Sequence, residues 1–584
     1  MHKWNLDVLY KSIEDSQYLA DRKTLLAKIE QLNELAASLE VADIETVKQI
    51  LVLKNDQAAL VRKLGAFLSL SDSVDSSNNE VKSHLGQLMQ DLSKGTEASA
   101  TINNFLASIE NLSELVADEY IKEHEFYLQE IIDGKQYQLS AKEESLISKI
   151  NLNGVNNWED LYDYLTSTYT MDYAGGKISL TEVRNLAYSD DQAVRKAAYE
   201  AEIAGYAGIE DSLAYSLNSI KGHVNTMVEL RGYEDAIDMT LIASRMSRTT
   251  LDALFAAIDD VLPKYREFLQ HKGKLLGHEN GIPFYDLFAP LVKSDTEYSI
   301  EVAEKMVLDS FKTFSPGLHD LVKRSFDDAW IDYLPRAGKR GGAFCSNLPM
   351  IKQSRIMHNY GYDLGSVVTL AHELGHAYHG HMIEDHHMLN TRYVMPIAET
   401  ASNFCELILS EAALKTASRN EKIELLENMI SDATQVIVDI YSRFLFEKSV
   451  IENRKDKFLS AADLKALMIS AQEQTYGNGL DKDYLHPYMW ACKGHYYSAG
   501  LNFYNFPYAY GALFSKGLYA KYLEEGDSFV AKYDNMLMNT TVLSSEAIGD
   551  LAGVNVREKE FWASSLAMIT DMIDEFIELT SQGI

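Results

Sequence analysis

Hydrophobic residues recur at intervals of three and four along most of this chain, which is the spacing of one face of an α-helix. Between residues 12 and 110 the repeat includes Leu25 and Ile29, with charged and polar residues on the other faces. The same spacing continues between residues 418 and 474 and again beyond Gly511. The pattern therefore predicts a mostly α protein that opens with an antiparallel helical lobe.

Two short segments depart from the helical pattern. Residues 171–178 contain Gly175-Gly176 and predict a hairpin. Residues 338–345 are rich in glycine, and residues 354–360 follow as a candidate paired strand. Glycine lets another chain approach a strand closely, so an extended peptide could add to this edge; a purely structural hairpin is the alternative. We expect a small β-sheet there.

Breaks in the pattern divide the chain into three parts. We expect an N-terminal helical lobe over residues 1–110, a helical connecting segment over residues 111–180, and a catalytic region over residues 181–584. With 584 residues, of which 46% are hydrophobic, the chain can bury a large core. Its 9 prolines also favour a mostly helical protein, because proline interrupts helices.

Charge and cysteine content limit the partners and the compartment. The formal charge of −32 at pH 7 argues against nucleic acid, because an acidic surface repels phosphate. Cys345, Cys405 and Cys492 are scattered and lack CxxC spacing, which suits a reducing cytoplasm. No secretory signal and no apolar run long enough for a membrane span are visible. We expect a cytoplasmic protein that binds neither nucleic acid nor membrane, and the pattern indicates no particular oligomeric state.

The segment His372-Glu373-Leu374-Gly375-His376 carries the most informative chemistry. It lies in a predicted helix from about Asp363 to His381, on which His372 and His376 are one turn apart on the same face. Glu373 lies about 100° round from His372, where its carboxylate can reach a metal-held water without binding the metal. Two such histidines with an intervening glutamate are typical of a zinc hydrolase.

A zinc site needs a third protein ligand. The metzincin pattern fails here, because it requires glycine where this chain has His379 and histidine where it has Met382. Glu384 lies too far along the same helix, about 12 Å of rise beyond His376. The third ligand must therefore come from a second helix.

Residues 395–406 supply a carboxylate from such a helix. Pro396 predicts a first helical turn, which places Glu399 near a helix N-terminus, where the helix dipole favours an ionised carboxylate. Glu406 lies on nearly the same face but about 10 Å away, so both cannot bind one ion. We choose Glu399 as the ligand; Glu406 either accepts a hydrogen bond from a ligand histidine or is a solvated surface residue.

The two motifs together resemble the oligoendopeptidase F group of the thimet-oligopeptidase-like (M3) zinc peptidases. They read His-Glu-x-Gly-His-x-x-His over residues 372–379 and Ala-Glu-x-Ala-Ser-x-Phe-x-Glu over residues 398–406. The resemblance implies a mostly α, two-lobed ellipsoid with a deep substrate channel and a small sheet beside the zinc helix. It implies a gluzincin site with one Zn²⁺ per chain, held by His372, His376 and Glu399. It also implies an oligoendopeptidase that hydrolyses internal bonds of short unstructured peptides.

The resemblance further assigns polar roles to an aromatic-rich segment before the last helices. A zinc peptidase needs hydrogen-bond donors for the oxyanion that forms when water adds to a peptide carbonyl, and tyrosine and histidine are suitable. The family places a histidine and several tyrosines here, which implies His495 and Tyr508 as donors and Tyr504 as a substrate contact. The third family tyrosine falls at Gly511, which leaves Tyr510 as the candidate to replace it.

We therefore expect Glu373 to act as general base toward a zinc-activated water and to pass the proton to the leaving amine. His379 would either hydrogen-bond near the ligands or be a plain helix residue. A carboxydipeptidase on the same fold is one alternative, with Arg340 or Lys493 as the cation for a terminal carboxylate. A non-catalytic peptide-binding or zinc-storing protein is another, but such a protein has no use for Glu373.

Overall fold

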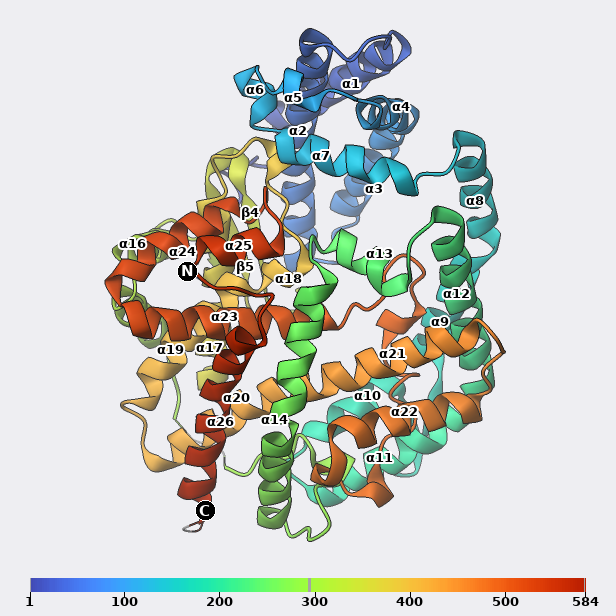
Figure 1. Cartoon of the computed structure of the whole chain (residues 1–584). Coiled ribbons are helices and arrows are strands. Elements are labelled where there is room, and N and C mark those ends of the chain that lie inside the picture. The colour runs from blue at the N-terminus through green and yellow to red at the C-terminus, as the bar shows by residue number, and fades with distance from the viewer. Residues whose placement is uncertain (1, 293–295, 582, 584) are drawn as a thin grey trace.

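The computed structural model describes residues 2–292, 296–581 and 583. The predicted N-terminal lobe begins at Met1, and the predicted catalytic region ends at Ile584. Both residues lie outside the described residues. The fold is mostly α, as predicted, with two small sheets. Figure 1 places the N-terminal helices together at one end of the molecule. None of the helices in the described ranges is both long and apolar enough to cross a lipid bilayer.

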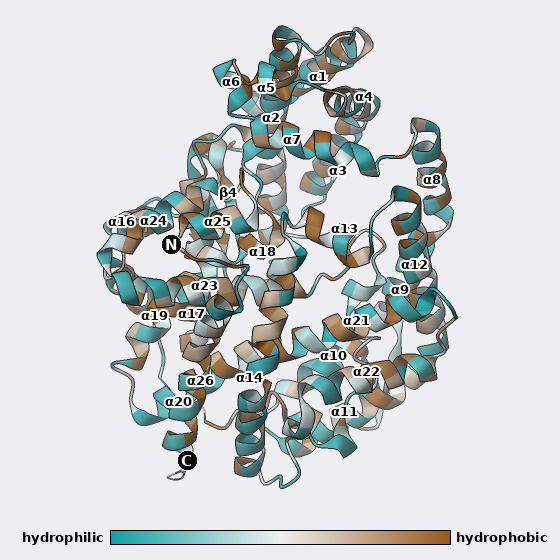
Figure 2. Cartoon of the chain, in the orientation of Figure 1, coloured by the Kyte–Doolittle hydropathy of each residue, from teal (hydrophilic) through white to brown (hydrophobic). Residues whose placement is uncertain are grey.

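From Ser16 onward, the first part of the chain consists of helices joined by short connections. Its helices are α1 (Ser16–Ala37), α2 (Ile44–Val74), α3 (Asn79–Ser93), α4 (Thr96–Ala107), α5 (Leu112–Leu115), α6 (Glu119–Lys122) and α7 (Glu125–Gly134). Leu25 and Ile29 of α1 are buried, as the pattern predicts, and Figure 2 shows hydrophilic and hydrophobic positions alternating along these helices. They enclose two small cores, one of which also contains Leu348 and Met357 from the second half of the chain.

The middle of the chain begins a separate, much larger core. Its elements are α8 (Ala141–Asn153), α9 (Val155–Thr168), β1 (Thr170–Tyr173), β2 (Gly176–Ser179), α10 (Leu180–Asn185), α11 (Gln192–Ala207), α12 (Glu210–Arg231), α13 (Ala236–Ala243) and α14 (Arg248–Leu275). β1 and β2 form the predicted antiparallel hairpin. The large core extends from Val155 to Phe576. The division of the chain at residues 110 and 180 stays a prediction.

A three-stranded sheet follows two further helices. These elements are α15 (Ile300–Lys312), α16 (Pro316–Asp327), β3 (Ile331–Asp332), β4 (Phe344–Leu348) and β5 (Gln353–Met357). The strand order is β3-β5-β4, and β4 runs antiparallel to β5 with Phe344 opposite Met357. The predicted pairing with the next strand is confirmed for Phe344 and Cys345, whereas the glycines before them lie in a loop outside the sheet. β4 is an edge strand with one side unpaired by the described strands.

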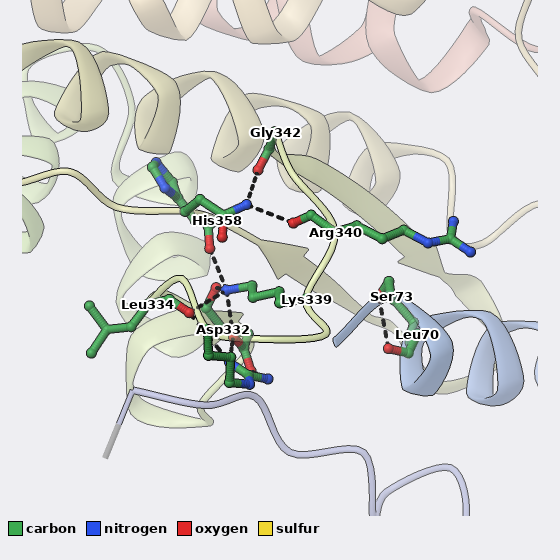
Figure 3. A network of polar contacts seen from close by, with 10 residues as sticks. Leu70, Ser73, Asp332, Leu334, Lys339, Arg340, Gly342 and His358 are labelled. Atoms are coloured by element: carbon green, nitrogen blue, oxygen red, sulfur yellow. Dashed lines mark hydrogen bonds and ion pairs between the residues drawn. The ribbon is translucent and has the colours of Figure 1, made fainter. Parts of the chain in front are cut away.

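The glycine-rich loop before β4 is fastened at two points. The Lys339 ammonium is buried, and it donates to the Asp332 carboxylate at 2.7 Å and to the Leu334 carbonyl at 2.9 Å. Figure 3 shows Arg340 pointing away from this cluster, toward α2, where it forms an ion pair with Asp72. The loop thus links the sheet to α2 and fixes the start of β4.

The rest of the chain supplies the helices around the candidate site. They are α17 (Leu364–Met382), α18 (Met395–Ala398), α19 (Thr400–Leu414), α20 (Arg419–Thr434), α21 (Ile440–Arg454), α22 (Ala461–Thr475), α23 (Phe506–Glu525), α24 (Asp527–Asn539), α25 (Ser545–Leu551) and α26 (Lys559–Ser581). The N-terminal helices hold the loop between α17 and α18. There the Leu389 amide donates to Asn55 at 3.0 Å, and His387 contacts Glu123 at 2.7 Å.

Candidate metal centre

Helix α17 presents the two histidines from a firmly packed scaffold. Asp363 caps it by accepting a hydrogen bond from the Ser366 amide at 2.7 Å, and the helix runs to Met382, close to the predicted bounds. Val367 and Leu370 are fully buried on the inner face. β4 packs against the helix on another side. α17 is therefore held along its length, which restricts the side chains that it carries.

His372 and His376 lie one turn apart on α17, as predicted. Their ring centroids are 4.8 Å apart. Glu399 reaches them from the junction between α18 and α19, where it occupies the N-cap position of α19. Pro396 lies in the first turn of α18, so the predicted position of Glu399 beside a helix N-terminus agrees with the structure. The Ser402 hydroxyl donates to Glu399 Oε2 at 2.8 Å and orients the carboxylate.

Gly375 allows the two helices to meet at backbone distance. A Cβ atom on Gly375 would lie 2.5 Å from the Ala401 carbonyl oxygen and 2.6 Å from the Ser402 Cα. Both distances are too short for any side chain, and the obstructing atoms are backbone atoms. Glycine is required here by this close approach rather than by its own φ angle. The contact brings Glu399 within reach of both histidines.

The donor atoms fit a tetrahedral zinc ion. Glu399 Oε2 lies 3.3 Å from His372 Nε2 and 3.3 Å from His376 Nε2. Zinc bonds of about 2.0 to 2.2 Å place tetrahedral ligand atoms about 3.3 to 3.6 Å apart. Among the described residues, these three form the one group of histidine, cysteine or carboxylate side chains whose ligand atoms all lie within 4.8 Å of one another.

Glu406 forms a hydrogen bond with His372 on the side of the ring that faces away from Glu399. Its Oε1 lies 2.7 Å from His372 Nδ1, which leaves Nε2 of the same ring facing Glu399. This arrangement fixes the ring orientation and increases the basicity of the ligand nitrogen. Of the two roles left open for Glu406, the hydrogen bond with a ligand histidine is therefore the one observed.

The donors influence one another's protonation. Burial alone would lower the pKa of His372, but hydrogen bonds with Glu399 and Glu406 outweigh burial and raise that pKa to about 10. Burial opposes ionisation of Glu399, yet its hydrogen bonds with His372 and His376 hold its pKa well below its usual range. Glu399 is thus ionised near neutral pH, as a metal ligand must be.

Glu373 has a different environment on the same helix. Its side chain is 5% exposed, and its Oε2 atom has no hydrogen-bond partner among the described residues. Burial raises the pKa of Glu373, and the nearby His376 and His372 counter only part of that shift. A buried carboxyl group with a raised pKa and a free oxygen is suited to accept and release a proton during a reaction.

The aromatic segment brings Tyr508 to the donor set. Tyr508, in the first turn of α23, lines the same cavity as His372 and Glu399, and burial raises its pKa. Its ring centroid lies 5.6 Å from that of Tyr504, which in turn lies 5.0 Å from that of His495. The three predicted residues therefore form one row of rings, with Tyr508 at the cavity wall and His495 at the other end.

Gly511 has a physical reason to depart from the family tyrosine. A Cβ atom there would lie 3.2 Å from the Pro396 carbonyl oxygen and 3.4 Å from the Glu399 Cβ, so the site leaves little room for a side chain. Tyr510 packs against Trp562 of α26 with 5.1 Å between ring centroids, and it is fully buried. Tyr510 is therefore directed into the core rather than toward the metal ligands.

His379 is buried apart from the donor set. Its Nε2 lies 2.7 Å from the Thr540 hydroxyl, and its ring stacks on Tyr393 at 4.3 Å. Burial lowers the pKa of His379 to about 3, so the ring is neutral. Because Thr540 directly follows α24, this hydrogen bond joins α17 to the C-terminal helices.

A cavity of about 840 Å³ opens beside the ligands. Helices α17, α19, α20 and α23 form its walls, and its lining includes His372, Glu399, Tyr508 and the hydrogen-bonded Glu406. Lys516 also lines this cavity, and none of the sequence patterns described above indicated a role for it. A signal was present: Lys516 is the one charged residue between Phe506 and Ala520 in an otherwise uncharged stretch of helix.

Comparisons with known proteins agree with this geometry. A family model described as peptidase family M3 matches residues 185–543, and one described as oligopeptidase F matches residues 107–170. The chain is 27% identical to chromosomal oligoendopeptidase F of Lactococcus lactis over 417 residues, which cover 70% of this chain and 68% of that protein. It is 23% identical to the group B oligopeptidase of Streptococcus agalactiae over 541 residues, which cover 91% and 87%.

Solved structures show the same fold. A structure from Chlamydophila abortus aligns with a TM-score of 0.87 at 20% identity and covers 99% of this chain and 98% of its own. The oligoendopeptidase-F structure from Enterococcus faecium aligns with a TM-score of 0.71 at 18% identity and covers 97% and 99%. The arrangement of helices around the donor set is therefore shared over nearly the whole chain.

Proposed function

The chain belongs to peptidase family M3 as a zinc metallopeptidase of the oligoendopeptidase F group, and we propose that it hydrolyses internal bonds of short, unstructured peptides. The observation that carries this proposal is the donor set of His372, His376 and Glu399 with the buried Glu373 beside it. A protein that only stored metal or bound peptide would have no use for a carboxyl group of raised pKa at that position.

The proposed chemistry assigns each polar group near the donors a step. When bound, one zinc ion per chain would acidify a water molecule and polarise the scissile carbonyl. His372 and His376 would hold the ion through Nε2, and Glu399 through Oε2. Glu373 takes the proton of the attacking water and then passes it to the leaving amine. Its raised pKa suits both halves of this transfer.

Tyr508 is the proposed donor to the oxyanion. Burial keeps its hydroxyl protonated, so that it can donate to the carbonyl oxygen as that oxygen becomes negative. We propose His495 as a second donor and Tyr504 as a substrate contact, because their rings continue from Tyr508. Loss of one oxyanion donor typically costs about 3 to 4 kcal/mol.

The free edge of β4 is a proposed binding place for the substrate backbone. Arg62 donates to the Asn347 carbonyl at 2.8 Å, and this carbonyl belongs to the β4 edge strand. Because peptide groups alternate in direction along a strand, those of Cys345 would face the same edge. Cys345 is close enough to Glu373 for the two side chains to interact electrostatically. An extended peptide paired there through main-chain hydrogen bonds would be held irrespective of its sequence.

The direct test is hydrolysis of internally quenched peptides of about 6 to 20 residues, chosen to fit an extended bound chain. We expect internal cleavage by the zinc-loaded wild type. In Glu373→Gln, kcat should fall by about 10²- to 10⁴-fold, because the general base is lost. Zinc content should remain that of wild type, because the three ligands are unchanged.

Glu384→Gln is the matched control for this test. Glu384 follows the same helix and hydrogen-bonds to His381 at 3.0 Å, away from the donor set. We expect wild-type kcat from this variant. Peptide bound by the zinc-loaded wild type without any cleavage would contradict the proposed function and support the peptide-binding alternative.

The cations considered for a carboxydipeptidase give that alternative little support. Arg340 is paired with Asp72. Lys493 lines a different cavity, together with Glu202 and His486. We also propose a cytoplasmic location, which the free state of all three cysteines favours, and short peptides as the partners of this chain.

A further inference from the structure

The cavity beside the donor set has a cation in its wall that lacks an ion-pair partner. Two lysines line this cavity, Lys272 and Lys516. Lys272 forms an ion pair with Glu427 at 2.9 Å. For Lys516, no carboxylate oxygen of the described residues comes within ion-pair distance, and only longer-range charges act on it. The two lysines therefore differ, because one is neutralised by the protein and the other is not.

The groups nearest to Lys516 leave its charge incompletely balanced. Burial lowers the pKa of Lys516, whereas Glu406 and Asp432 act to raise it. Glu406 is already engaged with His372 at 2.7 Å. The Asp432 carboxylate also lines the cavity, but it lies beyond ion-pair distance of the ammonium and acts on it only as a longer-range charge. A partly buried ammonium without a close counter-charge is unfavourable, and a ligand that brings an anion would relieve it.

Lys516 lies about two helical turns beyond Tyr508 on the face of α23 that lines the cavity. Tyr508, Ala512 and Lys516 follow one another at four-residue intervals on α23, and all three line the cavity. The rise from Tyr508 to Lys516 is about 12 Å, and helix side chains lean toward the N-terminus, so the ammonium extends back toward Tyr508. Two extended residues span about 7 Å.

We propose that Lys516 forms a subsite for a carboxylate of the substrate, two or three residues beyond the scissile bond on its C-terminal side. The carboxylate is either an aspartate or glutamate side chain within the peptide or, where the cleaved internal bond lies two or three residues from the end, the peptide's own C-terminus. In the absence of substrate, Asp432 acts on the ammonium only as a longer-range charge. This inference rests on the proposed peptidase function and adds to it a preference for an anionic group at a defined distance.

Matched peptide pairs test the inference. The first pair has one sequence that ends either in a free carboxylate or in an amide. The second pair ends in an amide and carries glutamate or glutamine two residues after the cleaved bond. We expect the wild type to cleave the charged peptide of one or both pairs with a kcat/KM about tenfold higher than that of its neutral counterpart. This factor corresponds to the free energy of one charge-assisted hydrogen bond. The pair that responds identifies the source of the carboxylate.

Substitutions assign the preference to Lys516. In Lys516→Met the charged-to-neutral ratio of kcat/KM should fall to about one, and in Lys516→Glu it should fall below one. Lys516→Arg keeps the charge and should retain a ratio above one. It therefore tests the subsite even if the methionine variant does not fold. Asp432→Asn should raise the ratio, because it removes the competing carboxylate. Lys521→Met is the control, since Lys521 lies on the same helix and contacts Glu524 and Glu525.

Binding and cleavage separate the possible failures. Binding of the same four peptides to zinc-loaded Glu373→Gln, measured as Kd, should reproduce the charged-to-neutral preference without turnover. Cleavage of both members of each pair at equal rates, or an unchanged ratio in Lys516→Met, would overturn the subsite and leave the peptidase proposal standing. No cleavage of any peptide by the wild type would instead overturn the peptidase proposal.

Discussion

Glu373 and Glu399 belong to one site, and burial affects both, but their pKa values move in opposite directions. Glu373 has an oxygen without a partner, so burial dominates and the pKa rises. Glu399 faces two histidines at 3.3 Å, and these interactions outweigh burial and lower the pKa. Environments that separate two carboxyl groups in this way indicate two roles, here a base and a ligand.

His358 gives the stability a pH dependence at the level of one residue. The ring is buried beside the sheet, Nε2 lies 3.0 Å from the Ser366 carbonyl, and Nδ1 has no hydrogen-bond partner in the part of the chain that the structure describes. Burial lowers its pKa from 6.5 to about 4. Between these values the unfolded chain binds the proton more readily, so stability present above pH 6.5 is lost as the pH falls toward 4.

We predict that this residue accounts for about 2 kcal/mol of the wild-type stability lost between pH 6.5 and pH 5. His358→Gln should lose less stability over that interval by about this amount, as measured by denaturant unfolding at both pH values. His319→Gln is the comparison, because His319 lies on the surface beside Asp320. Equal losses in wild type and His358→Gln would show that another group carries the dependence.

At the scale of elements, the donor set is a property of the contact between α17 and α19. The histidines come from one helix and the carboxylate from the start of the other. Gly375 and Ala401 meet where the helices touch. The spacing of the donor atoms is thus set by backbone packing, and side-chain rotation adjusts it only slightly.

We predict that Gly375→Ala weakens zinc binding by at least about tenfold, because the new Cβ pushes α19 away from α17. Chelator competition measures the affinity, and thermal melting should show a loss of stability as well. Gly365→Ala on the same helix is the matched control, since its Cβ would meet only Asp363 Oδ1 at 3.5 Å. An unchanged zinc affinity in Gly375→Ala would mean that α19 can shift without moving Glu399.

A buried ion pair positions the start of α23. Lys221 donates to Glu447 at 2.7 Å and to Asn502 at 2.9 Å, and Asn505 donates to the other oxygen of Glu447 at 3.0 Å. The Lys221 and Glu447 side chains are 0% and 2% exposed. This network fixes the turn that leads into the helix with Tyr508.

We predict that Lys221→Met costs about 3 to 5 kcal/mol, because it leaves the Glu447 charge buried and unpaired. The melting temperature should fall, and kcat should fall more than KM rises, because Tyr508 is displaced. The double variant Lys221→Met/Glu447→Gln should recover part of the stability. A single variant as stable as the wild type would show that Glu447 finds another partner or a proton.

The sequence predicts what depends on local spacing. The two histidines and Glu373 follow from helical periodicity within one segment, and the placement of Glu399 follows from Pro396 a few residues before it. The choice between the two roles considered for Glu406, and the pairing of Lys221 with Glu447, depend on partners far away in the chain. Because no local pattern encodes such distant pairing, only the folded structure shows it.

At the scale of the whole molecule, the site lies among helices from the second half of the chain, and the N-terminal helices pack against its sheet. Arg62 and the ion pair between Asp72 and Arg340 join α2 to β4 and to the loop before it. Leu389, between the ligand-bearing helices, is held by Asn55 of the same α2. The N-terminal helices thus contact both the proposed peptide-binding edge and the loop between the ligands.

We predict that this enclosure excludes folded substrates. A cleavable sequence placed in a surface loop of a stable host protein should be cut at least about 100-fold more slowly than the free peptide, because the host must open locally by about 3 kcal/mol. Mass spectrometry of the products provides the rates. A destabilised host with the same insert is the control and should regain cleavage. Equal rates for the free peptide and the stable host would contradict the exclusion.

The backbone contact at Gly375 also determines when a newly made chain can take up its metal. While the ribosome is still synthesising the protein, the two histidines are present without Glu399, and two imidazoles on one turn bind zinc weakly. The donor set is complete only after α19 has been made and has docked against α17. We therefore expect tight zinc binding only after these two helices have docked, so that metal uptake follows at least this step of folding.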